Sequence, residues 1–199
     1  MKAAEWKRTV RPLTPVDERW EFRGSLCYRL PVGWVLAGVL GEGSGFDQGI
    51  FIWRVQMPLF VPSEVVDLSW SERVGGGANK YDRHDVVSLE TAIRSATNSV
   101  APEDLALAGM ADLGSRSTNR RLLETAGYAA LLRGDLPRAR SALERAALGT
   151  VVAAWENEIV ERSHLMVTTM DQEGAAAAVT HLERWRDATA TALGLRAEA

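Results

Sequence analysis

Few residues of this chain combine the types and spacing that chemistry requires, and the first candidate is the glycine-rich segment 41–49, GEGSGFDQG. Closely spaced glycines let backbone N–H groups approach an anion such as phosphate. The segment lacks the Lys-Ser/Thr ending of a P-loop, and no G-x-G-x-x-G pattern can be drawn through it. A strand is expected to follow, so no helix N-terminus is placed to receive a phosphate, and Glu42 and Asp47 would repel one. We therefore predict a flexible hairpin loop.

Side chains that could act as nucleophiles or metal ligands are scattered along the chain. Ser44 lies between glycines, but not in the strand-to-helix G-x-S-x-G elbow of hydrolases. Cys27 is the single cysteine, so no intrachain disulfide can form, and no histidine lies near it in sequence. His84, His164 and His181 show no H-E-x-x-H spacing, and there is no Cys-x-x-Cys. The sequence thus predicts no catalytic residue, no metal site and no cofactor.

Two charged groupings have a functional and a structural interpretation. In Tyr81-Asp82-Arg83-His84 a carboxylate could orient the imidazole, but a solvated linker is the interpretation we favour. A concentration of arginines begins at Arg116, and acidic residues are interspersed in it, so solvated helix faces explain it better than an RNA-binding surface. These arginines are Arg116, Arg120, Arg121, Arg133, Arg138, Arg140 and Arg145.

Composition narrows the class of protein. The net charge is -3 and the sequence pI is about 5.7, which argues against non-specific binding to nucleic acid or to an anionic membrane. The N-terminal residues lack the apolar region of a signal peptide, and no apolar run approaches the roughly 20 residues that span a bilayer. We expect a soluble, cytoplasmic protein.

The first part of the chain has the pattern of an antiparallel sheet. Residues 20–30 alternate apolar and polar side chains, residues 34–40 are apolar throughout, and a third strand is expected over 50–57. A fourth strand is predicted where Val66, Leu68 and Trp70 alternate with polar residues. Four strands with short connections favour an antiparallel meander.

A proline-bracketed elbow follows the third strand, and its side chains are the best candidates for binding. The two prolines of 58–62, PLFVP, force an extended backbone. Aromatic and apolar residues near the elbow could line a binding groove, although core packing is the simpler interpretation. The candidate binding residues are Leu59, Phe60, Trp70, Arg73 and His84.

The glycine run at 75–77 and the polar residues after it form the best candidate linker. The apolar period then becomes helical, and alanine and leucine replace tryptophan and valine. We therefore predict an α+β protein with an antiparallel sheet region over 1–77, a linker over 78–87 and a helical bundle over 88–199. The helices could instead pack back on the sheet and make one continuous domain.

Within the helical region, segment 118–150 predicts a hairpin with a turn at Gly134-Asp135. Its small and apolar positions resemble one tetratricopeptide repeat, although Val151 stands where the usual proline would be. The positions that carry the resemblance are Leu123, Ala126, Gly127, Ala130, Gly134, Ala139, Leu143 and Ala146. The resemblance covers about one repeat, and it implies a helical pair of a kind that stacks into binding surfaces.

For function, these patterns favour a non-enzymatic interaction or regulatory module that binds another protein, of which a small immunity or accessory protein would be one example. Neither a nucleic acid nor a membrane is expected as a partner, and association with copies of itself is left open. The alternative is an enzyme or small-molecule binder with a pocket between sheet and helices. That pocket would use Glu42, Asp47, Arg54, Arg73 or His84.

Overall fold

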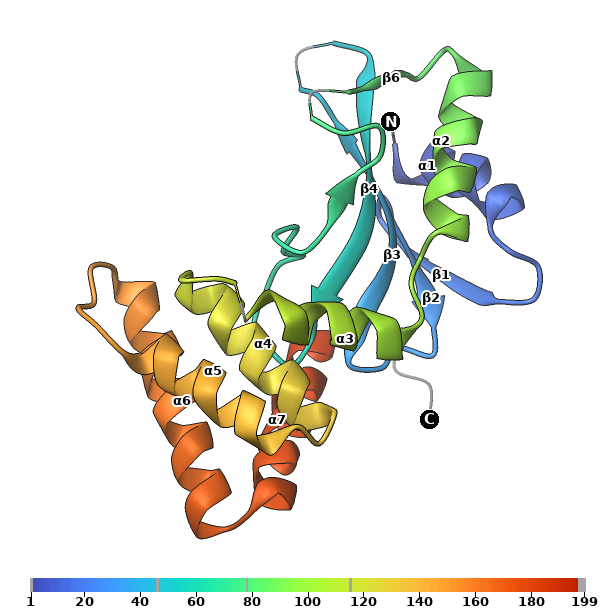
Figure 1. Cartoon of the computed structure of the whole chain (residues 1–199). Coiled ribbons are helices and arrows are strands. Elements are labelled where there is room, and N and C mark those ends of the chain that lie inside the picture. Colours follow the sequence, from blue (N-terminus) through green and yellow to red (C-terminus); the bar gives the residue numbers. More distant parts are fainter. Residues whose placement is uncertain (1, 46, 78, 115, 197–199) are drawn as a thin grey trace. The chain divides into compact units, whose positions relative to one another are not determined.

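The computed structural model describes residues 2–45, 47–77, 79–114 and 116–196, and the chain divides into two compact units. The sheet unit contains an antiparallel sheet with short helices, and the helical unit contains helices, their connections and the short segment Phe60–Pro62 (Figure 1). This confirms the predicted α+β class, with an antiparallel sheet followed by helices. The sheet unit is Met1–Leu59, Ser63–Pro102 and Ala190–Ala199, and the helical unit is Phe60–Pro62 and Glu103–Thr189.

The described part of the sheet has six strands, in the order β1-β2-β3-β4-β5, and every neighbouring pair is antiparallel. β6 also pairs with β4, at the N-terminal end of that strand. The strands are β1 (Arg19–Arg23), β2 (Leu26–Leu30), β3 (Val35–Gly43), β4 (Gly49–Pro58), β5 (Glu72–Arg73) and β6 (Tyr81–Asp82).

Two strand predictions were wrong in detail. Residues 20–30 form a hairpin and not one strand, because Gly24 takes a positive φ of 58° and turns the chain between β1 and β2. No strand forms over 66–70, although Val66 and Leu68 still pack against the core of the sheet unit. The strands that follow β4 are β5 and β6, and the glycine run lies between them.

The glycine run therefore works as a turn within the sheet unit. Gly75, Gly76 and Gly77 have φ values of 80°, 76° and 42°, a region that glycine enters without steric cost. The segment 78–87, which we predicted as a linker, contains β6 and the start of α2 (Val86–Asn98). The first unit continues through α2 to Pro102 before the chain enters the long helical segment of the second.

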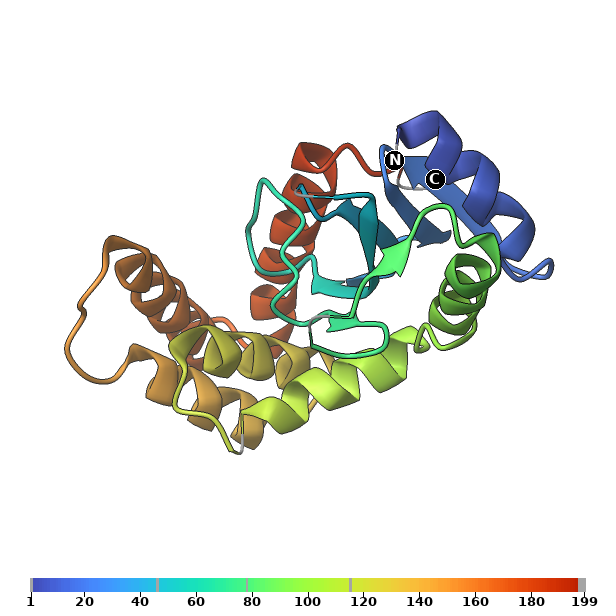
Figure 2. The ribbon, with the colours of Figure 1, turned by 90° about the horizontal axis from the view of Figure 1, so that it is seen from above.

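The sheet carries a buried core on each face. On one face, α1 (Ala3–Val10), the 3₁₀ turn η1 (Arg11–Leu13) and α2 cover strand residues such as Val39 and Ile52 (Figure 2). Trp6 of α1 is fully buried there, and a Cβ at Gly41 would lie 2.5 Å from its ring, so β3 needs glycine at this point. The opposite core contains Tyr28, Leu36, Val55, Met57, Leu59, Leu193 and Leu195.

The helical unit is built from antiparallel helices with short connections. Asn119 caps α4 by accepting hydrogen bonds from the backbone of Arg121 and Leu122, and Asp135 caps α5 by accepting one from Arg138. Gly134, at a φ of 77°, turns the chain between these two helices. The helices are α3 (Glu103–Leu113), α4 (Arg120–Leu132), α5 (Leu136–Ala147), α6 (Ala154–Gln172) and α7 (Ala175–Ala192). Residues 118–150 thus contain a helical hairpin, and its resemblance to a tetratricopeptide repeat stays a prediction.

Close packing fixes the pairing of α4 and α5. A Cβ at Gly127 would lie 2.6 Å from Cγ of Leu143, so the two helices approach more closely than any side chain at 127 would allow.

No helix in the described ranges is both long enough and apolar enough to cross a bilayer.

Candidate functional site

The elbow residues predicted to bind a partner are core residues. Leu59 and Phe60 both have an exposed fraction of 0%. Leu59 packs in the core of the sheet unit. The Phe60 ring meets the Tyr128 ring edge to face inside the helical unit, with 6.3 Å between centroids and an interplanar angle of 83°. A partner could not reach these side chains without moving the chain, so they are not part of the candidate site.

Arg73 has a structural role on the sheet. It lies opposite Trp53 across the β4–β5 pair, and its guanidinium lies 4.1 Å from the Phe51 ring centroid and 4.5 Å from that of Trp53. Its Nη1 donates to the Gly77 carbonyl at 2.7 Å. A cation held between two rings is stabilised by both ring quadrupoles. Arg73 therefore fastens the glycine turn and β5 to the face of β4 that carries Phe51 and Trp53.

The other two predicted binding residues are not brought together with Arg73. Trp70 is half-buried in the loop before β5, and His84 is exposed after β6, where its backbone N–H donates to Asp82. Among the described residues, no hydrogen bond or ion pair joins Arg73, Trp70 and His84.

The polar residues named for an enzyme pocket pair locally. Glu42 accepts a hydrogen bond from Nε1 of Trp53 at 2.9 Å, and Arg54 forms an ion pair with Glu72. Asp47 pairs with Lys80, and that bond, with those from Ser44 and the Gly49 backbone, holds the pKa of its carboxyl far below the usual range. These contacts organise strand ends and loops, and they do not converge on one reacting position.

The strongest buried electrostatic cluster lies inside the helical unit. Glu124 of α4 has an exposed fraction of 0% and accepts hydrogen bonds from Arg162 Nε at 2.7 Å, Arg162 Nη2 at 3.2 Å and the Tyr128 hydroxyl at 3.0 Å. Burial raises the pKa of Glu124, and the pairing with Arg162 opposes that rise. Burial also raises the pKa of Tyr128 well above its ordinary value. The three side chains satisfy one another's hydrogen-bonding groups, so this cluster ties α4 to α6.

Two arginines fix the loops at one end of the helical unit. Arg145, near the end of α5, donates to the carbonyls of Gly114 at 2.7 Å and Ser117 at 2.6 Å, in the loop between α3 and α4. Arg120, at the start of α4, donates to the carbonyls of Leu148 at 2.8 Å and Thr150 at 3.0 Å, in the loop between α5 and α6. The two loops consequently lie side by side at the same end of the unit (Figure 1).

Large apolar side chains are exposed at this end. Val152 is 88% exposed, Leu148 68%, Trp155 46% and Leu113 41%. The guanidinium of Arg121 lies 5.5 Å from the centroid of the Trp155 ring. We call this area the loop-end surface, and it consists of Leu113, Arg116, Arg121, Leu122, Leu148, Val152 and Trp155.

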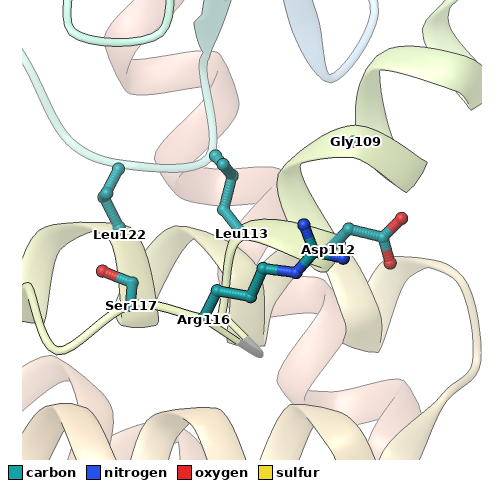
Figure 3. A pocket seen from close by; sticks show the side chains of 6 residues that line it. All are labelled: Gly109, Asp112, Leu113, Arg116, Ser117 and Leu122. Atoms are coloured by element: carbon teal, nitrogen blue, oxygen red, sulfur yellow. The ribbon is translucent and has the colours of Figure 1, made fainter.

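A surface depression opens on the α3–α4 side of the loop-end surface. Its volume is about 570 Å³, and Figure 3 shows Leu113 and Leu122 pointing to the same side of it. Asp112 lies at its edge and pairs with Arg138 at 2.8 Å. The lining residues are Gly109, Asp112, Leu113, Arg116, Ser117 and Leu122. This mixture of apolar and cationic side chains can hold a bulky apolar group next to an anion.

Comparisons with known proteins add no assignment, because no protein-family model, curated protein or solved structure matches this chain.

Sequence reasoning did not identify the loop-end surface. The arginines of this region were interpreted as solvated, whereas Arg120 and Arg145 bind loop carbonyls. One signal was present in the sequence: segment 148–155, LGTVVAAW, contains six apolar residues and no charged one. It comprises the α5–α6 connection and the first two residues of α6. Loops between helices are ordinarily polar, so an uncharged apolar connection is itself an indication of a binding surface.

Proposed function

We propose that this protein is a non-enzymatic protein-interaction module and that it binds its partner through the loop-end surface. The observation that supports the proposal is the exposure of Leu148 and Val152 on the α5–α6 connection and of Trp155 at the start of α6. Arg120 holds this connection in place by donating to two of its carbonyls. Grouped exposed apolar side chains mark interaction sites, whereas singly scattered ones are ordinary.

The composition of this surface also favours a protein partner. Tryptophan and arginine are the residue types most enriched where binding energy concentrates, and Trp155 and Arg121 are already in contact. The loop-end surface is preorganised, because two arginines bind four loop carbonyls. A partner would therefore lose little free energy in ordering these loops on binding.

The enzyme alternative receives no comparable support. Glu42, Asp47, Arg54 and Arg73 each have a local partner within the sheet unit. General acid–base or nucleophilic catalysis requires groups that meet at one reacting position.

The proposal is tested by affinity capture from the native cell with wild-type protein and two variants. Trp155→Ser removes the aromatic side chain of the loop-end surface. Leu165→Ser is the matched control, since Leu165 lies on the same helix α6 and has a similar exposed fraction, 42% against 46%. Circular dichroism checks that both variants fold.

We expect one or more proteins that wild type and Leu165→Ser retain and that Trp155→Ser loses. Equal retention by Trp155→Ser would exclude the loop-end surface as the docking site. Failure of the wild type to retain any specific protein at near-physiological salt would contradict the interaction proposal itself.

A further inference from the structure

One glycine of the helical unit is not explained by the packing of the described residues. In the part of the chain that the structure describes, two glycines lie inside helices, Gly109 in α3 and Gly127 in α4. Leu143 requires glycine at 127, whereas a Cβ at 109 would meet nothing within 4 Å. The backbone at Gly109 is helical, so no positive φ requires glycine there either. Since glycine weakens a helix relative to alanine, α3 contains a residue that its own packing does not need.

Gly109 lies at the centre of an exposed apolar stripe. Leu105 is 61% exposed and Leu113 is 41% exposed, and they lie four residues before and after Gly109. Residues at this spacing share one side of a helix, and the two leucines span about 12 Å along its axis. We call Leu105, Gly109 and Leu113 the α3 stripe. The residues of α3 that are buried are Ala106, Leu107, Met110 and Ala111.

The surface depression adjoins the α3 stripe. Gly109 and Leu113 line it together with Leu122 of α4, and Figure 3 shows the two leucine side chains on the same side of it. Asp112 and Arg116 add polar groups to the lining. A backbone that approaches α3 at Gly109 can therefore place an apolar side chain beside Leu113 and Leu122.

A helix is the element that suits this surface. Within the helical unit α3 packs on α4, α4 on α5 and α5 on α6, so α3 is the first helix of a row (Figure 1). A helix that lies on the α3 stripe continues this row. Glycine lets two helices approach closely, as Gly127 does between α4 and α5. An extended segment would gain no backbone hydrogen bonds from α3, because the backbone groups in a helix interior are already paired.

A second copy of this chain suits the α3 stripe less well. α3 contains Glu103, Asp104 and Asp112 and no basic residue. Pairing of two α3 helices would bring like charges together, which disfavours association. A helix of another protein is free of this constraint.

We infer that the partner docks through an amphipathic helix that packs along the α3 stripe. The backbone of this helix passes over Gly109, and one of its bulky apolar side chains enters the depression beside Leu113 and Leu122. This inference rests on the proposed function above. It adds the secondary structure of the partner segment, and it extends the docking site from the loop-end surface along α3.

The test selects peptides that bind the full chain from two displayed libraries. Both libraries randomise the apolar positions of an alanine-rich amphipathic helix of about five turns, with equal numbers of Lys and Glu elsewhere. The second library differs only by a proline at the centre, which breaks the helix. We expect binders from the first library alone. Their affinities are measured by fluorescence anisotropy.

Substitutions at position 109 separate docking from folding. Gly109→Ala should weaken the binding of the selected peptides about tenfold, and Gly109→Leu should weaken it further, because each side chain fills the room that the helix needs. Neither side chain meets a neighbour in the protein itself, so urea unfolding should show no loss of stability for Gly109→Ala. Ala176→Leu is the matched control, since Ala176 is exposed on α7 of the same unit and should leave the affinities unchanged.

The outcomes distinguish this inference from the proposed function. Equal recovery of binders from the proline library, or recovery of none from either library, would refute the helical partner, and the capture experiment would still decide the proposed function. Helical binders that Trp155→Ser weakens and Gly109→Leu does not would refute the α3 stripe and leave the loop-end surface as the docking site. A dimer in sedimentation that Gly109→Leu abolishes would overturn the inference in favour of a second copy.

Discussion

Replacing Arg162 by alanine should be one of the most destabilising single changes in the helical unit. Arg162 donates two hydrogen bonds to Glu124, at 2.7 and 3.2 Å, and Glu124 has no exposed surface. The substitution leaves the carboxylate buried with the Tyr128 hydroxyl as its remaining side-chain donor. A charge that loses its partner in the interior retains its desolvation cost without the compensating attraction.

The expected loss can be worked out in two ways. A hydrogen bond to a charged group contributes about 1.5–3 kcal/mol, so two of them give about 3–6 kcal/mol. Removing one partner of a buried ion pair in other proteins costs about 3–5 kcal/mol. We therefore expect the free energy of unfolding to fall by about 4 kcal/mol, a large part of the roughly 5–15 kcal/mol of a whole domain.

The loss should depend on pH in a defined direction. Burial already raises the pKa of Glu124 against the opposing effect of Arg162, and removal of Arg162 raises that pKa further. Below the ordinary Glu pKa of about 4.3, the carboxyl is protonated in both folded and unfolded states, and the penalty is absent. Between that pH and the raised pKa of Glu124 in the folded variant, the carboxyl is ionised in the unfolded state but still protonated in the folded state. Stability of the variant relative to wild type therefore falls as pH rises.

Urea unfolding followed by far-ultraviolet circular dichroism, at about pH 4.5 and about pH 8, measures both effects. Arg140→Ala is the control, because Arg140 pairs with Asp171 and Glu144 on the surface and should change stability by less than about 1 kcal/mol. The double variant Glu124→Leu/Arg162→Met should recover most of the loss. A loss below about 1 kcal/mol at about pH 8, or one that does not change with pH, would refute the reasoning.

Three further outcomes follow from packing and burial. Gly127→Ala on α4 should lower the free energy of unfolding by about 1–3 kcal/mol, because its methyl would lie 2.6 Å from Leu143. Gly109→Ala on α3 should raise the free energy of unfolding by about 0.5–1 kcal/mol, because its methyl meets open space. Urea unfolding that ranks these two variants in the opposite order would contradict the packing argument. Cys27 is fully buried, which raises the pKa of its thiol to about 12, so a disulfide reagent should label it only after unfolding. Arg73→Ala should lower the free energy of unfolding by about 1–2 kcal/mol and change tryptophan fluorescence, because it removes the guanidinium that contacts the rings of Phe51 and Trp53. An unchanged emission spectrum would count against that contact.

The fold class could be predicted from the sequence because the two periodicities are well separated along the chain. Strand alternation ends near β4 and helical spacing begins at α2, and the α+β architecture follows from that change. The hairpin over residues 20–30 was missed because alternation continues through its turn. Leu26 resumes the apolar pattern of Trp20 and Phe22, so only Gly24 indicated the reversal.

The extent of the first unit could not be read from local patterns. A run of three glycines suggests a linker, but the residues on both sides of it pair with β4, and pairing is a long-range property. The candidate site was missed for a related reason. Leu59 and Phe60 are apolar and sit at an elbow, but only the packed structure shows that they are buried and that Leu148 and Val152 are not.

The division of the chain has a consequence for how the protein folds during synthesis. Residues 103–189 are inserted between two stretches of the sheet unit, and Leu193 and Leu195 complete a core that begins with Leu26 and Tyr28. Until residues 190–195 have left the ribosome, that face of the sheet lacks part of its cover, whereas every residue of the helical unit has already been made. The core of the sheet unit can therefore be completed only after the whole helical unit has been synthesised, and apolar surface that stays exposed until then is prone to aggregation.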